Sequence, residues 1–355
     1  MSGTESLVGV DVGGTRTAAM IVDREMASDA GSGSLVAGVD VGGTTTSIVI
    51  TDVRDRVLYE HVAPTDPSSL VGQIAGLVDD GRRQLGRDLV AVGVAVPGHV
   101  DPADGSVRMA VNLGITHLAL GPLLQTELGI AIFVEHDARA AVLWLSEHAA
   151  DGSAQAPASV AFLAIGTGIA AGVVLDGALL RGDNGFAGEV GHIVADPGGA
   201  VCACGLRGCL ETIAAGPAIG RQADEAVAAG RRTILSSQSS AAEVFRAAAA
   251  GDEVAIEIID RVADHLARAI RSLALILGIK RFVIGGGVAA AGPALLEPIR
   301  SCIARERGAS PLVEAALGDA TIELLSPTEA PGARGAAAIA RYRIGLPEGE
   351  GVGER

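Results

Sequence analysis

The sequence predicts an α/β protein of two domains with a cleft between them, and three observations support this fold class. A β-branched strand–turn–strand pattern begins at residue 36, and a similar pattern begins at residue 159. Each pattern is followed by further strands and helices, which is typical of two separate α/β domains. Apolar residues make up 49% of the 355 residues and aromatic residues only 2%, so we expect cores of Val, Ile, Leu and Ala.

The first domain is predicted from the elements that follow residue 36. Two β-branched runs flank a Gly-Gly-Thr turn and a third run covers residues 57–62, which predicts a three-stranded antiparallel meander. A helical pattern covers residues 68–85. The run LVAVGVAVPGHV at residues 89–100 is nearly all apolar and ends in Pro-Gly, which indicates a strand buried on both faces.

Later elements are predicted in the same way. Residues 130–149 form a strand that runs into a helix near Asp137. In residues 257–277, apolar side chains recur at spacings of three and four, which indicates an amphipathic helix. Residues 280–292 predict a short buried strand that enters a glycine turn and a helix, and the polar tail beyond residue 346 is expected to fray.

Charge and apolar patterning exclude several classes of function. The formal net charge of −15 argues against a nucleic-acid partner, because phosphates need Lys and Arg for neutralisation. The sequence has no apolar run of about 20 residues, so we expect no membrane span. The N-terminal MSGTES lacks the basic and apolar regions of a signal peptide, which favours a cytoplasmic protein.

The N-terminal part of the chain contains the same turn twice. Residues 9–23 match residues 38–52 at about ten of fifteen positions. Both copies contain Asp-Val-Gly-Gly-Thr, at Asp11–Thr15 and at Asp40–Thr44. Only the second copy continues into a third strand and a helix, whereas the first is followed by a linker-like segment.

We predict that the second copy, Asp40–Thr45, is the working turn, meaning the one that binds the ligand. The reason is that a sheet has only one position at which such a turn faces the ligand. The first copy is expected to be a duplicated hairpin at the surface. Alternatively, the two copies compete for the same place in the sheet, since a basic residue, Arg16, stands where the second copy has Thr45.

Three glycine turns follow strand ends and suit the binding of nucleotide phosphates. Glycine lets the backbone approach a ligand, and successive N–H groups can bind an anion. Taken alone, each turn is more often an ordinary hairpin; together they point to a nucleotide held across a cleft. The candidate residues are Asp40, Gly42, Gly43, Thr44, Thr45, Gly166, Thr167, Gly168, Gly285, Gly286, Gly287 and Val288. An Asp at a strand end can also hold Mg²⁺ through water.

The most specific stretch is the sequence from residue 186 to residue 211. His192, Cys202, Cys204 and Cys209 form a Cys₃His set, which describes a closed structural Zn²⁺ site with no position left for water. Reduced thiols in a loop are the alternative, but three cysteines with Gly-rich spacing have few other uses. Such a site would also hold Glu189 and Glu211 rigidly, ready to accept hydrogen bonds from a polyol.

Asp137 lies at the end of a predicted strand, immediately before a helix. A carboxylate at this place can accept a proton from an alcohol, as a general base does in phosphoryl transfer. The alternative is that Asp137 is a helix N-cap, and this alternative is favoured when the residue is considered on its own.

Taken together, these motifs resemble the ROK family (repressors, open reading frames and sugar kinases) of the hexokinase/actin-like superfamily. The resemblance covers residues 36–340. GVDVGGTTT resembles its first phosphate motif, and VPGHVD and VNLG resemble its sugar-domain loops. LAIGTGIAAGVVLDGALLRGDNGFAGEVGH and CACGLRGCLE are similar to its signature and zinc motif, and GGGV and GARGAAAIA to its C-terminal nucleotide elements.

The resemblance implies a two-domain actin-like ATPase (ribonuclease H-like) fold that uses ATP, Mg²⁺ and structural Zn²⁺. It implies the domain boundaries 1–34 (duplicated extension), 35–137 (small domain), 138–335 (large domain) and 336–355 (a helix returning to the small domain, then the tail). A homo-oligomer, a dimer or a tetramer, is expected.

The resemblance also implies roles for individual residues. Asp137 would be the catalytic base on the sugar hydroxyl, normally the 6-hydroxyl. The sugar would be bound by Gly98, Asn112, His136, Glu189, His192 and Glu211. The glycine turns would hold the phosphates and the nucleoside.

This chain departs from the family pattern around the base. The family usually has Asn-Asp-Ala-Asn, whereas this chain has His136-Asp137-Ala138-Arg139. A histidine has a different donor and acceptor set, and its charge can change near neutral pH. We therefore expect the substrate to be glucose, an epimer of glucose, or an amino sugar such as glucosamine, N-acetylmannosamine or kanosamine.

Two alternatives to a sugar kinase remain at this stage. A sugar-responsive transcriptional regulator of the same family is disfavoured, because about 35 residues precede the working turn and they contain no basic recognition helix. A catalytically inactive sugar-binding protein is disfavoured by the presence of Asp40, Asp137, Glu189 and the Cys₃His set.

Overall fold

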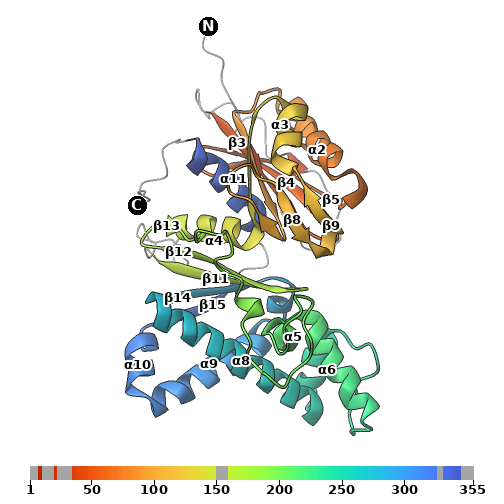
Figure 1. The fold of residues 1–355 in the computed structure, drawn as a ribbon, viewed down its shortest axis with the longest axis vertical. Helices are drawn as coiled ribbons and strands as arrows, with labels where there is room; N and C mark the ends of the chain where they lie inside the picture. The colour runs from red at the N-terminus through yellow and green to blue at the C-terminus, as the bar shows by residue number, and fades with distance from the viewer. Residues whose placement is uncertain (1–6, 10–19, 22–33, 149–158, 326–330, 345–355) are drawn as a thin grey trace. The chain divides into compact units, whose positions relative to one another are not determined.

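The computed structural model describes residues 7–9, 20–21, 34–148, 159–325 and 331–344 (Figure 1). The chain divides into two compact units. The first contains residues 1–158, 176–187 and 328–355, and the second contains residues 159–175 and 188–327. The predicted mixed α/β class is confirmed, and each unit is described in turn.

The first unit is built on a twisted sheet with strand order β10-β6-β1-β3-β4-β5-β2, in which β3 and β6 also pair directly, and on a small antiparallel sheet β7-β8-β9. Its strands are β1 (Leu7–Gly9), β2 (Met20–Ile21), β3 (Leu35–Val41), β4 (Thr45–Asp52), β5 (Val57–Pro64), β6 (Ala91–Val96), β7 (His99–Val100), β8 (Val107–Ala110), β9 (Ile115–Leu118), β10 (Ala131–His136) and β13 (Ala178–Leu179). Its helices are η1 (Pro67–Ser69), α2 (Leu70–Leu85), η2 (Val111–Leu113), α3 (Leu120–Leu128), α4 (Asp137–Glu147) and α11 (Pro331–Arg343).

The meander predicted from residue 36 is confirmed, because β3, β4 and β5 pair antiparallel in sequence order. β3, β6 and β10 run parallel, and they place Asp40 beside Ala95 and His136 beside Val96. The carboxyl ends of these three strands therefore lie at one edge of the sheet, which is where ligands bind in open α/β sheets.

The helix α11 packs unusually close to this sheet and lies beside β3 (Figure 1). A side chain on Gly38 of β3 or on Gly93 of β6 would overlap the backbone of Ala336 or Ala337. The alanine-rich face of α11 and these two glycines bring backbone against backbone, which leaves no room for a methyl group.

The described strands of the first sequence copy join the same sheet. Leu7 and Val36 both pair with Ala91 of β6, while Met20 and Val49 both pair with Glu60 of β5. The described strands of the first copy thus pair with the same partner residues as the corresponding residues of the second copy. The turn Asp11–Thr15 itself lies outside the described residues.

The second unit contains strands β12, β11, β14 and β15 in that spatial order, with helices packed around α8. The strands are β11 (Val160–Ile165), β12 (Ile169–Leu175), β14 (Arg281–Gly285) and β15 (Thr321–Leu324). The helices are η3 (Val190–His192), α5 (Glu211–Ala214), α6 (Gly216–Ala228), α7 (Ala241–Ala249), α8 (Glu253–Leu277), η4 (Gly287–Ala291), α9 (Pro293–Ala309) and α10 (Pro311–Leu317).

The amphipathic helix predicted at residues 257–277 is confirmed within α8. Asp252 caps its N-terminus by accepting from Ala255 N, and Gly278 ends it in the left-handed conformation. Ile258, Val262 and Leu266 lie on its buried face.

The compact units differ from the predicted domain boundary at residue 137. Helix α4 begins there but belongs to the first unit, because α11 packs directly against it. A side chain on Gly335 of α11 would overlap the carbonyl of Ala140. Only tertiary packing determines this assignment, and nothing in the local pattern of α4 indicates it.

Candidate active site

The turn between β3 and β4 carries the first group of predicted phosphate-binding residues. Gly42 N donates to Thr45 O at 3.1 Å, and Thr65 braces the turn by donating its Oγ1 to Gly42 O at 2.8 Å. Gly43 and Thr44 are exposed. The hydroxyl of Thr45 is buried and has no hydrogen-bond partner among the described residues.

Predicted sugar-binding residues lie next to this turn. A side chain on Gly43 would come within 3.4 Å of the carbonyl oxygen of Asn112, which η2 carries. Gly98, with φ of +95°, follows β6 and packs so closely on β8 that a side chain would approach Ala110 to 2.9 Å. The first unit thus brings Gly43, Gly98 and Asn112 to the carboxyl edge of its sheet.

Asp137 follows β10 at the same edge and begins α4. Its side chain is 37% exposed, and its Oδ1 accepts from Ala138 N at 2.6 Å and lies 3.2 Å from His136 Nδ1. A carboxylate in the first turn of a helix is stabilised by the helix dipole. Asp137 is not the N-cap, which is His136. Asp137 is therefore an oriented and accessible carboxylate at the end of a buried strand.

Sequence reasoning assigned no role to the charged residues on either side of Asp137. Glu135 and Arg139 are buried and hydrogen-bonded to each other, and Glu135 also contacts Arg181. Burial raises the pKa of Glu135. The nearby guanidinium groups of Arg139 and Arg181 lower it by more than burial raises it, so the pKa of Glu135 lies below its usual value. The signal available in the sequence was a carboxylate at the end of an otherwise apolar strand, which requires a cationic partner.

In the second unit, two glycine turns meet at the ends of parallel strands. β11 and β14 pair with Ala164 beside Gly285, and a side chain on Gly166 would lie 3.8 Å from Gly287 N. The turn Gly166–Gly168 is held by Gly216 N, which donates to Gly166 O at 2.8 Å. The Gly285–Val288 turn is so close to Ile165 that Gly286, with φ of +86°, has no space for a side chain.

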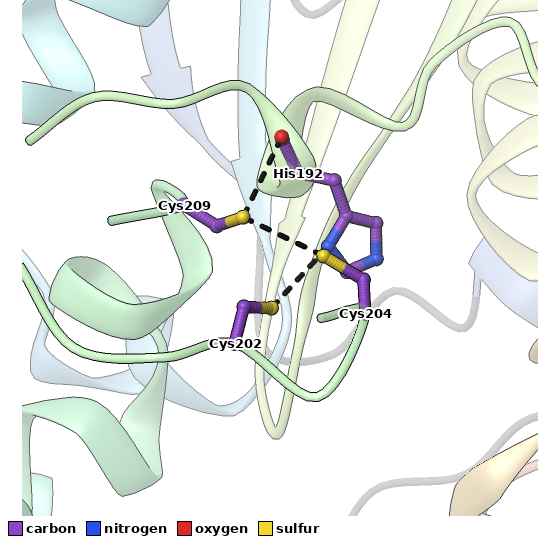
Figure 2. A group of neighbouring side chains, drawn as sticks. All are labelled: His192, Cys202, Cys204 and Cys209. Carbon is purple, nitrogen blue, oxygen red and sulfur yellow. Dashed lines mark hydrogen bonds between the residues drawn. The ribbon is translucent and has the colours of Figure 1, made fainter. Parts of the chain in front are cut away.

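The four predicted metal ligands converge in the second unit (Figure 2). Their ligand atoms all lie within 4.8 Å of one another. His192 Nδ1 lies 3.6 Å from Cys202 Sγ, and Cys204 Sγ lies 3.7 Å from Cys209 Sγ. A tetrahedral ion with Zn–S of about 2.3 Å and Zn–N of about 2.0 Å places such atom pairs about 3.5–3.8 Å apart. The set therefore fits one tetrahedral metal ion.

The three thiols of this group differ in the direction of their pKa shifts. Burial raises the pKa of Cys209 to about 12 and also raises the pKa of Cys202, while a hydrogen bond from the backbone of Leu206 lowers that of Cys204. A bound metal ion would displace the thiol protons, so its binding would be coupled to proton release.

Both predicted polyol-binding carboxylates of the second unit adjoin the Cys₃His group. Glu189 Oε2 lies 4.0 Å from His192 Nε2. Glu211 Oε1 lies 3.9 Å from Cys202 Sγ, and its Oε2 accepts from Ile169 N at 3.0 Å. Glu211 thus connects the metal-binding group to the glycine turn before Ile169.

Comparison with known proteins agrees with this geometry. The model of the ROK family matches residues 36–343. A glucokinase of Halalkalibacterium halodurans is 37% identical over 228 residues, which are 62% of this chain and 68% of that protein. The DNA-binding transcriptional regulator NagC of Escherichia coli is 33% identical over 69% of this chain and 60% of its own length.

A solved structure has the same fold. The ROK family glucokinase of Streptomyces griseus, in complex with glucose and AMPPNP, has a TM-score of 0.70 and 29% identity, and the match covers 87% of this chain and all of that one (100%). The predicted actin-like fold class is therefore confirmed. Among the described residues, no helix is long and apolar enough to cross a membrane.

Proposed function

The chain belongs to the ROK family of sugar kinases and related regulators, and from this premise we propose that it transfers the γ-phosphoryl group of ATP to the 6-hydroxyl of a hexose or amino sugar. The observation that supports this most is Asp137, an accessible carboxylate at the sheet edge that also carries Asn112 and the Gly42–Thr45 turn. Likeness to a glucokinase supports the reaction class.

In the proposed reaction, Asp137 acts as the general base. Its carboxylate accepts the proton of the sugar hydroxyl as that oxygen attacks the γ-phosphorus, and the bond to the bridging oxygen breaks as ADP leaves. The proton then passes from Asp137 to solvent. The hydrogen bond from Ala138 N and the contact with His136 hold the carboxylate in one orientation. This preorganisation lowers the entropic cost of reaching the reactive geometry.

Six residues are proposed to bind the hydroxyl or amino groups of the sugar: Gly98, Asn112, His136, Glu189, His192 and Glu211. Because Nδ1 of His136 faces Asp137, its Nε2 is the ring atom that remains for the sugar.

We also propose binding sites for the nucleotide and for the metal ions. The glycine turns at residues 42–45, 166–168 and 285–288 would bind phosphates and nucleoside. Asp40 is the candidate for Mg²⁺, because it lies at the end of β3, immediately before the Gly42–Thr45 turn, where a carboxylate can hold the ion through water. Mg²⁺ would neutralise phosphate charge. Zn²⁺ in the Cys₃His set would be structural.

Regulation of transcription is a second candidate function, because NagC is also similar to this chain. A regulator would bind a sugar without consuming ATP. A turnover assay therefore separates the two functions directly.

The test is an assay of ADP and sugar phosphate with ATP, Mg²⁺ and a panel of glucose, mannose, glucosamine, N-acetylglucosamine, N-acetylmannosamine and 3-amino-3-deoxyglucose. We expect turnover with at least one sugar, and loss of about 10²–10⁴-fold in kcat for Asp137→Asn with sugar binding retained. Asp66→Asn is the matched control, because Asp66 is an exposed cap in the same unit whose hydrogen bonds an Asn can keep. Near-normal kcat in Asp137→Asn would refute the base assignment.

A further inference from the structure

A buried charged cluster surrounds the strand end that carries Asp137. The side chains of Glu135 and Arg139 are only 7% and 3% exposed. Burying ionised groups is costly unless they are paired and fully hydrogen-bonded. Because this cluster is costly to bury and lies next to the proposed catalytic residue, we consider a role for it in the reaction as well as in stability.

The hydrogen bonds of the cluster join three parts of the chain. Arg139 Nε donates to Glu135 Oε1 at 2.7 Å, and that same oxygen accepts from His136 N at 3.0 Å. Arg139 Nη1 donates to Gly185 O at 2.8 Å. Arg181 Nε donates to the other carboxylate oxygen of Glu135 at 2.7 Å. The end of β10, the first turn of α4 and the segment Arg181–Ala187 are thereby connected.

The segment Arg181–Ala187 carries groups suited to a ligand. The ring of Phe186, which is 43% exposed, stacks on the ring of His99 with 4.2 Å between centroids. His99 Nε2 also lies 3.2 Å from Asn184 O. In the sequence, Ala187 is followed by Gly188 and then by Glu189, a proposed sugar ligand.

We propose that Arg139 is a positioning residue for phosphoryl transfer, holding the Glu135–Asp137 strand end and the Arg181–Ala187 segment in one fixed arrangement. The proposal rests on the proposed kinase function. Arginine suits this role because Nε and Nη1 of one rigid guanidinium point to different acceptors. The Asn that the family usually has at this place is too short to reach both Glu135 and Gly185. This chain thus fixes its base by a contact that the family pattern does not contain.

The test compares Arg139→Met with Arg341→Met. Arg341 is a matched control, because it lies in the same unit, its side chain is 6% exposed, and it binds two carboxylates, those of Asp55 and Glu147. Both variants are assayed well below their melting temperatures. We expect Arg139→Met to raise the KM for the sugar and to lower kcat, each about tenfold, with the KM for ATP unchanged within about twofold. Arg341→Met should lose stability and keep all three constants within about twofold.

Hydrogen exchange of the protein without ligands provides a second measurement. Arg139→Met should exchange faster at the amides of residues 181–187 and at His136, and Arg341→Met should not. If Arg139→Met fails to fold, Arg139→Lys replaces it in the test, because lysine keeps a positive charge beside the buried carboxylate of Glu135. A lysine can reach only one of the two acceptors, and we expect the same kinetic changes at reduced size.

The results distinguish this proposal from the proposed function. Absence of turnover in the unaltered protein would refute the kinase function, and hydrogen exchange would still show whether Arg139 fixes the segment. Kinetic constants of Arg139→Met within twofold of the unaltered protein would overturn the positioning role. Equal kinetic losses in Arg139→Met and Arg341→Met would overturn it too, because the effect would then be one of general stability.

Discussion

Replacement of Arg341 by Met should destabilise the first unit by an amount that the structure allows us to estimate. Arg341 lies on α11 and donates to Asp55 Oδ1 at 3.0 Å and to Glu147 Oε2 at 3.0 Å. Removing one partner from a buried ion pair typically costs about 3–5 kcal/mol, because a buried charge is left without compensation.

The lower end of this range applies here. Asp55 keeps two other donors, Trp144 Nε1 at 2.7 Å and Arg334 Nη1 at 3.1 Å, whereas Glu147 loses its guanidinium partner. We therefore expect a loss of about 3 kcal/mol in the free energy of unfolding. For a domain of this size, that corresponds to a fall in Tm of about 6–12 °C.

The loss should also depend on pH. Burial raises the pKa of Glu147 above its usual value, and Arg341 only partly offsets this effect. A carboxyl whose pKa is raised by folding contributes stability that is fully present below its unfolded pKa and is lost as pH rises through the folded pKa. In Arg341→Met the pKa of Glu147 should rise further, so the difference from the unaltered protein should shrink as pH falls from about 7 to about 4.5.

Urea unfolding of both proteins at these two pH values is the assay. A loss below about 1 kcal/mol at neutral pH would place this pair among weak surface ion pairs and refute the reasoning. A loss that does not decrease at the lower pH would show that Glu147 is not the group left unpaired.

Three further predictions concern the metal-binding group, the repeat and the close packing of α11. Purified protein should contain one Zn²⁺ per chain by elemental analysis, and Cys204→Ser should lose it; a folded, active protein without metal would contradict the structural role. Deletion of residues 1–34 should leave kcat and KM unchanged, and loss of activity with intact folding would show that the first copy supplies the working turn. Gly38→Ala should destabilise by more than about 2 kcal/mol because its methyl group would overlap α11. Gly76→Ala, where space is open, should be neutral or stabilising by up to about 1 kcal/mol, and equal effects of the two substitutions would refute the packing argument.

Local patterns predicted much of the fold. The β-branched runs after residue 36 indicated β3, β4 and β5, and the spacing of Ile258, Val262 and Leu266 indicated α8. The Cys₃His set was predictable because its four ligands are close in sequence and have few alternative uses.

Features that depend on distant contacts were not predictable. Arg139 and Arg181 meet at Glu135 although they are far apart in the chain, so the sequence shows only unexplained charges. The placement of α4 in the first unit depends on Gly335 of α11, which no pattern near residue 137 reveals.

The central claim is tested most directly by product analysis with the unaltered protein and Asp137→Asn. Phosphorus NMR of a reaction with ATP, Mg²⁺ and the preferred sugar should show equal amounts of ADP and sugar 6-phosphate. The Asp137→Asn protein should bind the sugar and form almost none of this product. Phosphorylation at another hydroxyl would correct the regiochemistry, and ADP formation that does not require a sugar, or none at all across the panel, would contradict the assignment as a sugar kinase.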